Sequence, residues 1–270
     1  MAQCGMPPAS FARFRDLILA TDPDAVAGPD RIPAGFLLAS AGRVSAHYIP
    51  FDHVNLQARV VVVGISPGFV QWKNAVREAR RQLVLGMPEH EVLRAAKYTG
   101  AFSGAIRPNL VALLDHIGLQ HWLGIASCAS LFGADAHLMH VTGALRQPIF
   151  VDGANYNGAS PNMLTTPLLQ AQLLEYFGHE AAQLAHAVFV PLGPKVGLAL
   201  SWLAQRGIID EKRILHGLPH PSGANAERIA YFLGRKEMHS LSSRTNGARI
   251  DADRLALREK MTDLGMPPLP

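Results

Sequence analysis

A histidine and a serine lie in two loops that are the first candidates for chemistry in this chain. His220 is flanked by Pro219 and Pro221, and Ser66 lies within Gly64-Ile65-Ser66-Pro67-Gly68. Each loop follows a short apolar run and is rich in Gly and Pro. This pattern is typical of a buried strand that delivers a rigid loop to a sheet edge. A histidine held there can stabilise developing charge, and a serine can attack or orient a reactant.

The first loop matches G-x-S-x-G, the nucleophile elbow of α/β-hydrolases. In that elbow the backbone N–H of the residue after the serine helps to form the oxyanion hole, and here that residue is Pro67, which has no N–H. Ser66 also follows too little chain to supply the strands that precede the elbow in that fold. A phosphate-binding P-loop is disfavoured as well, because no Gly-Lys-Ser/Thr closes the segment.

The composition excludes several other classes. A hydrophobic content of 49% with 17% charged residues indicates a well-buried globular protein. The apolar stretches are shorter than the roughly 18 residues that span a bilayer, and no signal-peptide pattern opens the chain. We therefore expect a cytoplasmic, monomeric protein without a membrane segment. Two cysteines cannot build a four-cysteine zinc or iron–sulfur site, and we expect neither metal nor cofactor.

The net charge of +4 is compatible with nucleic acid but does not require it. Four basic residues recur at helical spacing just after the first loop: Lys73, Arg77, Arg80 and Arg81. They form either a solvated basic face or a set of contacts to DNA phosphates beside an active site. Both interpretations stay open.

Four apolar segments predict parallel strands, at residues 59–64, 123–127, 187–191 and 213–217. Helical patterns occupy residues 11–20, 73–85, 89–98, 108–117, 168–186, 194–206, 226–233 and 251–264. Strands that alternate with helices predict a three-layer α/β/α sandwich around a central, twisted, four-stranded parallel sheet. The loops at the carboxyl ends of such strands form the ligand crevice, and both candidate loops fall there.

We expect a single domain over residues 1–270. Its core spans residues 51–234, and residues 1–58 wrap around that core. Residues 132–167, rich in Gly, Asn, Ser and Pro, are expected to form an irregular insertion, and a segment of this kind is usually either functional or disordered. Residues 235–270 are expected to form a C-terminal helix and a tail.

The pairing of a G-x-x-P-G loop with a later H-P-S loop resembles the uracil-DNA glycosylase superfamily, whose members flip a base out of DNA and cut its glycosidic bond. The resemblance covers about residues 51–234. It implies a monofunctional DNA glycosylase that works without a cofactor and leaves an abasic site. Some branches of the superfamily carry a four-cysteine iron–sulfur cluster, which this chain cannot build.

In that superfamily the histidine of the second loop stabilises negative charge that develops on the departing base, which assigns this role to His220. One such hydrogen bond in a dry pocket changes the rate by about 10²–10³-fold. The resemblance also implies that Ser222 and Gly223 grip a DNA phosphate beside the extruded nucleotide.

The first loop of the superfamily carries an Asp or Asn that positions the attacking water, and Ser66 stands in its place here. A serine can orient water but is a poor base. Two alternatives then stay open: cleavage depends mainly on stabilisation of the leaving group and of the oxocarbenium ion while Ser66 orients the water, or a carboxylate elsewhere, for which Asp152 is the candidate, activates the water. Ser127 is the nearest match to the Asn that ends the second strand and reads the base, and Phe69 could stack on that base. The base pocket is expected to contain Gly64, Ile65, Pro67, Gly68, Phe69 and Ser127.

The small side chains of Ser66 and Ser127 predict a roomy pocket. A bulky modified pyrimidine, such as the glucosylated hydroxymethylcytosine of phage DNA, is therefore favoured over uracil, and defence against phages is one setting for it. The alternatives are a non-catalytic nucleic-acid-binding module of the same fold, a uracil-DNA repair glycosylase, and a hydrolase of free nucleosides. The basic helix and the phosphate-gripping loop disfavour the last.

Overall fold

A computed structural model describes residues 10–100 and 106–265. The chain divides into two compact units, each assembled from separate stretches of sequence. The first unit comprises Met1–Val54, Ile65–Ala101 and Gly143–Glu180, and the second comprises Asn55–Gly64, Phe102–Thr142 and Ala181–Pro270. The first candidate loop, from Ile65 onward, belongs to the first unit, whereas the loop of His220 belongs to the second.

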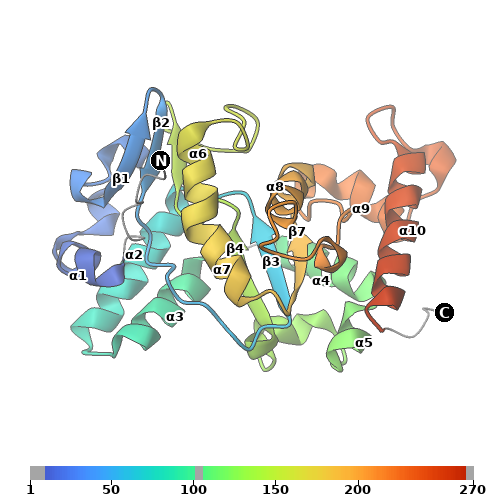
Figure 1. Ribbon diagram of the computed structural model, residues 1–270, viewed down its shortest axis with the longest axis horizontal. Coiled ribbons are helices and arrows are strands. Elements are labelled where there is room, and N and C mark those ends of the chain that lie inside the picture. The colour runs from blue at the N-terminus through green and yellow to red at the C-terminus, as the bar shows by residue number, and fades with distance from the viewer. Residues whose placement is uncertain (1–9, 101–105, 266–270) are drawn as a thin grey trace. The chain divides into compact units, whose positions relative to one another are not determined.

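The sheet of the second unit is parallel and lies among helices. Strand β3 (Val60–Gly64) pairs in parallel with β7 (Val188–Pro191), and β4 (Met139–Gly143) flanks β3 on the other side. Figure 1 shows β3 and β7 side by side. Both strands are buried along nearly their whole length, as a parallel strand covered on both faces must be. The prediction of a mixed α/β fold with a parallel sheet is confirmed.

Helices of the second unit pack their apolar faces into one core with this sheet. In α4 the buried residues Leu110, Leu113 and Leu114 recur at helical spacing and pack with Val190 of β7. The side chain of Asn246 accepts a hydrogen bond from Arg249 N–H and so caps the last helix. The helices are α4 (Ile106–His116), α5 (Leu119–Leu123), α8 (Pro194–Ala204), α9 (Ala226–Phe232) and α10 (Gly247–Asp263).

The first unit has an antiparallel sheet of its own. Its strand order is β1-β2-β5-β6, formed by β1 (Leu37–Ala41), β2 (Val44–His47), β5 (Ile149–Val151) and β6 (Ala154–Asn155). An aromatic core lies beside it, in which the rings of Phe14 and Tyr48 stack with centroids 3.8 Å apart. The helices are α1 (Phe11–Ala20), α2 (Phe69–Val84), α3 (Glu89–Gly100) and α6 (Pro167–Gln172), and the boundary between the units falls within α7 (His179–Gln183). Helices α2 and α3 pack against each other (Figure 1).

The predicted second strand at residues 123–127 is wrong. Helix α5 runs to Leu123, and Gly124 then adopts a left-handed conformation with φ 75°, which ends the helix. Ser127 caps a 3₁₀ turn instead of ending a strand. The second strand of the parallel sheet is β4, in which His140 and Thr142 interrupt the apolar pattern that marks β3.

The prediction that residues 132–167 form an irregular insertion is also wrong, because this segment contains β4, β5 and β6. The predicted fourth strand at residues 213–217 contributes one isolated parallel bridge, between Ile214 and Phe189. The described sheet therefore has three strands. The helix predicted at residues 168–186 is a continuous helical run from Pro167 to Gln183 with a π-helical turn at Leu173–Gly178.

Candidate functional site

The carboxyl edge of the parallel sheet carries the loop of His220. Leu192 N–H donates to Val63 O over 2.8 Å and so extends the pairing of β3 with β7 to this edge. Gly193 follows directly, and a Cβ added to it would lie 3.7 Å from Cδ2 of His220. The histidine ring therefore lies against the end of β7. Gly64 occupies the same edge at the end of β3, where its added Cβ would be 3.8 Å from Thr142 O.

His220 is held as a neutral hydrogen-bond donor. Its Nδ1 accepts a hydrogen bond from the backbone N–H of Ser222 over 3.2 Å. A ring nitrogen that accepts a hydrogen bond carries no proton, so the proton of the neutral ring lies on Nε2. Burial lowers the pKa of His220 below its usual 6.5 and stabilises this neutral form. The ring thus offers an Nε2–H donor at the sheet edge.

Two asparagines hold this loop in place. Asn109 of α4 donates from Nδ2 to Pro221 O over 2.9 Å, and Asn225 donates from Nδ2 to Ser222 Oγ over 3.2 Å. The N–H of Ser222 is committed to His220, whereas its hydroxyl accepts from Asn225 and keeps its own proton. Phosphate binding by Ser222 and Gly223 stays a prediction.

In the first unit, Ser66 ties the first loop to the segment that precedes β5. Its hydroxyl lies 3.2 Å from Gln147 O, a bond it can donate, and it accepts from Ile149 N–H over 3.1 Å. Leu145 N–H donates to Ile65 O over 2.9 Å. The hydroxyl of Ser66 therefore bonds to main-chain groups and holds two segments together, which is a structural role. Its role toward water stays a prediction.

The remaining residues of the first loop lead into α2. Gly68 N–H donates to Gln71 Oε1 over 3.1 Å, and Phe69 N–H donates to Asn155 Oδ1 over 2.9 Å, so side chains cap both amides. The half-buried ring of Phe69 stacks on Trp72 with centroids 6.0 Å apart. Pro67 and Ile65 are also half-buried. Base stacking by Phe69 stays a prediction.

Carboxylates already pair with much of the basic set on α2. Arg77 forms an ion pair with Asp24, and Lys73 lies 4.0 Å from the same carboxylate. Arg81 pairs with Glu78 over 2.7 Å. Arg80 differs from these, because it is exposed and its Nε donates to the main-chain carbonyl of Leu19 over 3.1 Å.

Asp152 lies at the tight turn between β5 and β6. It has φ 49° and is followed by Gly153 with φ 73°, the Asp-Gly pairing typical of a type I′ hairpin turn. Its carboxylate lies 3.2 Å from Arg43, and both side chains are more than half exposed. The geometry therefore explains Asp152 as a turn residue, and its catalytic role stays a prediction.

Ser127 is part of a separate polar contact in the second unit. Its hydroxyl donates to Asp115 Oδ2 over 2.7 Å and accepts from Ala129 N–H over 3.1 Å. Ser127 does not follow a strand, so it does not match the strand-ending Asn of the superfamily. Its place in a base pocket stays a prediction without that support. The residue that ends the second strand is Gly143, where an added Cβ would lie 2.8 Å from Leu145 O.

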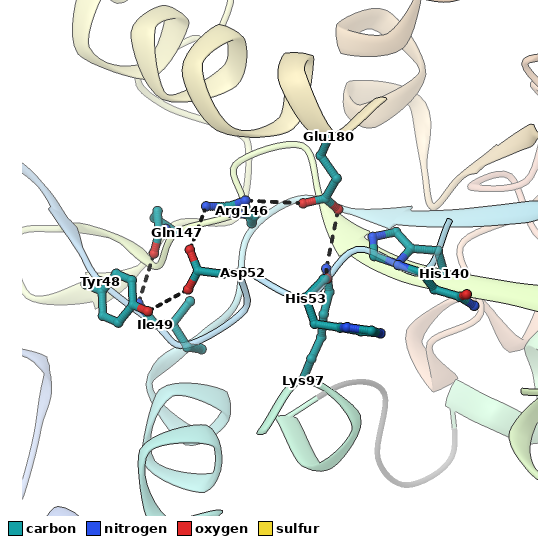
Figure 2. Close-up of polar contacts among 10 residues, drawn as sticks. Tyr48, Ile49, Asp52, His53, Lys97, His140, Arg146, Gln147 and Glu180 are labelled. Carbon is teal, nitrogen blue, oxygen red and sulfur yellow. Dashed lines mark hydrogen bonds and ion pairs between the residues drawn. The ribbon is translucent and has the colours of Figure 1, made fainter. Parts of the chain in front are cut away.

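A buried network of charges in the first unit was missed in the sequence. Figure 2 shows Asp52 between Tyr48 and Arg146, and Glu180 between Arg146 and Lys97. Tyr48 donates to Asp52 over 2.5 Å, and Arg146 lies 3.3 Å from Asp52 and 3.6 Å from Glu180. Lys97 Nζ lies 3.4 Å from Glu180. No short motif links these residues, which come from four separate segments.

Burial dominates the electrostatics of this network. It raises the pKa of Asp52, against the opposing effects of Arg146 and of the Tyr48 hydrogen bond. It lowers the pKa of Lys97 to about 8, against the opposing effect of Glu180. Gln147, next to Arg146, accepts a hydrogen bond at Oε1 from Ile49 N–H over 2.9 Å. The network therefore fixes the same segment that Ser66 binds.

Within residues 10–100 and 106–265, no three His, Cys, Asp or Glu side chains come together as ligands for a metal ion. Over the same residues, no helix has both the length and the apolar character needed to cross a membrane.

Comparison with known proteins gives one clear relationship. The chain is 32% identical over 234 residues to the uncharacterized protein YoxB of Bacillus subtilis (strain 168), an alignment that spans 85% of this chain and 90% of YoxB. No protein-family model matches the sequence, and no solved structure matches it. At this identity and coverage, the chain belongs to the same protein family as YoxB.

Proposed function

We propose that this protein is a monofunctional DNA glycosylase that hydrolyses the N-glycosidic bond of a flipped-out modified pyrimidine. The observation that carries the proposal is the neutral His220 ring, whose Nε2–H is available at the carboxyl edge of a parallel sheet. That edge is where open α/β sheets bind their ligands. A fixed donor in a half-buried setting suits a reaction in which negative charge develops on a departing group.

The proposed reaction breaks the bond between C1′ of the sugar and the base nitrogen. The electron pair of that bond leaves with the base, and the Nε2–H of His220 donates a hydrogen bond to the base oxygen on which the charge gathers. A water oxygen bonds to C1′, and its proton passes to solvent or to the departing base. The products are the free base and an abasic site in the DNA.

The proposal also includes a fourth strand in the parallel sheet. We infer that residues around Ile214 extend the parallel sheet as a fourth strand next to β7, inside a three-layer α/β/α sandwich. The bridge between Phe189 and Ile214 supports this, as does the hydrogen bond from Leu215 N–H to Phe189 O over 2.8 Å. The strand order would then be β4, β3, β7 and the segment at Ile214.

The preference for a bulky base over uracil rests on Ser66, which stands where a larger Asp or Asn would restrict the space. This small side chain supports a site that accepts a modified pyrimidine such as glucosylated hydroxymethylcytosine. DNA is the proposed partner, and the reaction as proposed uses no cofactor.

A second candidate function is a non-catalytic DNA-binding module of the same fold. One observation favours it: both residues proposed to act on water are already bonded within the protein. The hydroxyl of Ser66 binds the main chain at Gln147 and Ile149, and Asp152 pairs with Arg43 on an exposed turn.

A substrate panel separates the two functions. Duplex and single-stranded DNAs of one sequence carry uracil, hypoxanthine, hydroxymethylcytosine or its glucosylated form at one position, and alkali then cleaves any abasic site. We expect scission of the DNA that carries the glucosylated base, with the His220→Ala variant as the inactive control. DNA binding without scission of any of these DNAs would contradict the enzyme and favour the module.

A further inference from the structure

A groove in the second unit lies along α4, and the proposed function gives its residues no role. Its volume is about 510 Å³. Pro108, Val111, Ala112 and Leu233 supply apolar lining, and Asp115, His116 and Arg235 supply polar lining. A mixed lining of this kind suits a ligand that has both an apolar and a charged part.

The charge at this groove is mainly positive. Arg235 lines the groove, and Arg258 lies outside the lining but close enough to His116 to act on its charge. Both arginines are exposed, and in the described part of the chain neither guanidinium has a hydrogen bond or an ion pair. Burial is the main cause of the lowered pKa of His116. The positive charges of Arg258, Arg254 and Arg235 lower this pKa further. Arg254 is already paired with Asp251 over 2.7 Å.

The one carboxylate in the lining is already bonded within the protein. Asp115 accepts hydrogen bonds from Ser127 Oγ–H and from Cys128 N–H, each over 2.7 Å. These bonds leave Arg235 and Arg258 as the groups that are ready to bind a ligand anion. Guanidinium groups bind phosphate oxygens through paired hydrogen bonds, so a phosphate is the anion that this pair would favour.

The groove starts beside the loop of His220. Pro108, Ala112 and Asp115 lie on one face of α4, and the eight residues from Pro108 to Asp115 span about 10 Å along the helix axis. Asn109, next to Pro108, donates the hydrogen bond that holds Pro221. An extent of about 10 Å matches the axial rise of about three nucleotides along one DNA strand.

We propose that this groove binds a nucleoside phosphate unit of the DNA strand that flanks the excised base. Arg235 and Arg258 bind the phosphate, and the sugar or base lies on the apolar wall formed by Val111, Ala112 and Leu233. The proposal rests on the proposed function for its choice of DNA, but the groove is a separate subsite that adds affinity and sets the register of the strand.

The test measures binding, without cleavage. A fluorescein-labelled single-stranded DNA without any modified base is titrated with the protein, and anisotropy is followed at several salt concentrations. Arg235→Ala with Arg258→Ala removes two positive charges at the groove. The matched control is Arg206→Ala with Arg249→Ala, because both are exposed arginines of the same unit that have partners nearby, Trp202 and Asp253.

We expect the groove variant to bind the DNA at least about 10-fold more weakly and to lower the salt slope by about 0.7, since the loss of one phosphate contact on single-stranded DNA removes about that much slope. The control variant should stay within about 2-fold of wild type. Equal losses in both double variants would show that only net charge matters and would overturn the proposal.

A third variant tests the groove without changing its charge. Ala112→Phe should fill the apolar wall and weaken DNA binding to a similar degree, with an unchanged melting temperature as proof of folding. Wild-type affinity in this variant would overturn the proposal. Competition by deoxycytidine monophosphate decides the source of the phosphate. A nucleotide that displaces the DNA only at a concentration far above the dissociation constant of the DNA fits the DNA assignment, whereas displacement at a concentration near that constant would favour a free nucleotide as ligand and contradict it.

The outcome is independent of the glycosylase test. Loss of binding in the groove variants without excision of any base would retain the subsite and reject the enzyme. Excision by wild type together with wild-type DNA binding in the groove variants would reject the subsite and retain the enzyme.

Discussion

Ser222 N–H donates a hydrogen bond to Nδ1 of His220 over 3.2 Å, and this contact decides which nitrogen of the ring carries the proton. The neutral ring must then donate through Nε2. Because the donor is Ser222 of the same loop, the tautomer is set locally by the His-Pro-Ser sequence. Asn109 and Asn225 then fix the loop itself.

The pH dependence of excision follows from this arrangement. Burial lowers the pKa of His220 below 6.5, so the neutral donor persists when the solution becomes mildly acidic. We expect the single-turnover excision rate to stay constant from neutral pH down to about 6.5 and to fall only below it, where protonation of Nδ1 also breaks the contact with Ser222. A pH–rate profile on the best substrate measures this. An acid limb centred above 6.5 would contradict it.

The buried charges of the first unit should matter for stability. Glu180→Gln removes the carboxylate that lies 3.4 Å from Lys97 and leaves a buried positive charge without it. We expect the free energy of unfolding, measured by urea denaturation, to fall by about 3–5 kcal/mol. The control is Arg43→Ala, which breaks the exposed pair with Asp152 and should cost at most about 1 kcal/mol. Equal effects of the two substitutions would show that the network is not a stabilising core.

The hydrogen bonds of Ser66 lead to a prediction that separates structure from catalysis. Ser66→Ala leaves Ile149 N–H without its partner, so the free energy of unfolding should fall by about 1–3 kcal/mol. The excision rate per folded molecule should change little. Ser66→Asn should instead lower excision of a bulky base, because added heavy atoms overpack a filled site. A large loss of excision in Ser66→Ala at unchanged stability would return Ser66 to the role of orienting water.

Two arginines of α2 make a matched pair for DNA binding. Arg77 is neutralised by Asp24, whereas Arg80 is exposed and, within the described part of the chain, bonds to a main-chain carbonyl and to no carboxylate. We expect Arg80→Ala to weaken binding to all DNA sequences alike and to reduce the salt slope by about one. Arg77→Ala should leave the slope nearly unchanged. If neither substitution alters the slope, α2 presents a solvated basic face and does not contact phosphate.

The predictable parts of the fold are those in which local pattern and burial agree. Helix α1 has the predicted bounds, and β3 lies within the predicted segment as a run of buried valines. The second strand was misplaced because residues 123–127 are apolar but follow a helix that ends at Gly124. The actual strand, β4, contains His140 and Thr142, so its pattern is weaker than that of β3.

The candidate site was predictable only where a motif is contiguous. The His220 loop is such a case, since the residue that sets its tautomer is two positions away. The buried network was not predictable, because Asp52 and Glu180 are brought together through Arg146 by tertiary folding and share no spacing. Asp152 is a candidate only as a carboxylate within residues 132–167, although the Asp-Gly pair that it forms with Gly153 is a hairpin signal.

The most direct test of the account is the single-turnover excision rate of His220→Ala on the DNA base that the wild-type protein releases fastest, with DNA affinity measured in parallel. If the Nε2–H of His220 stabilises the departing base, the rate should fall by about 10²–10³-fold while the affinity for DNA stays within about 2-fold. An excision rate in His220→Ala equal to that of wild type would contradict the account.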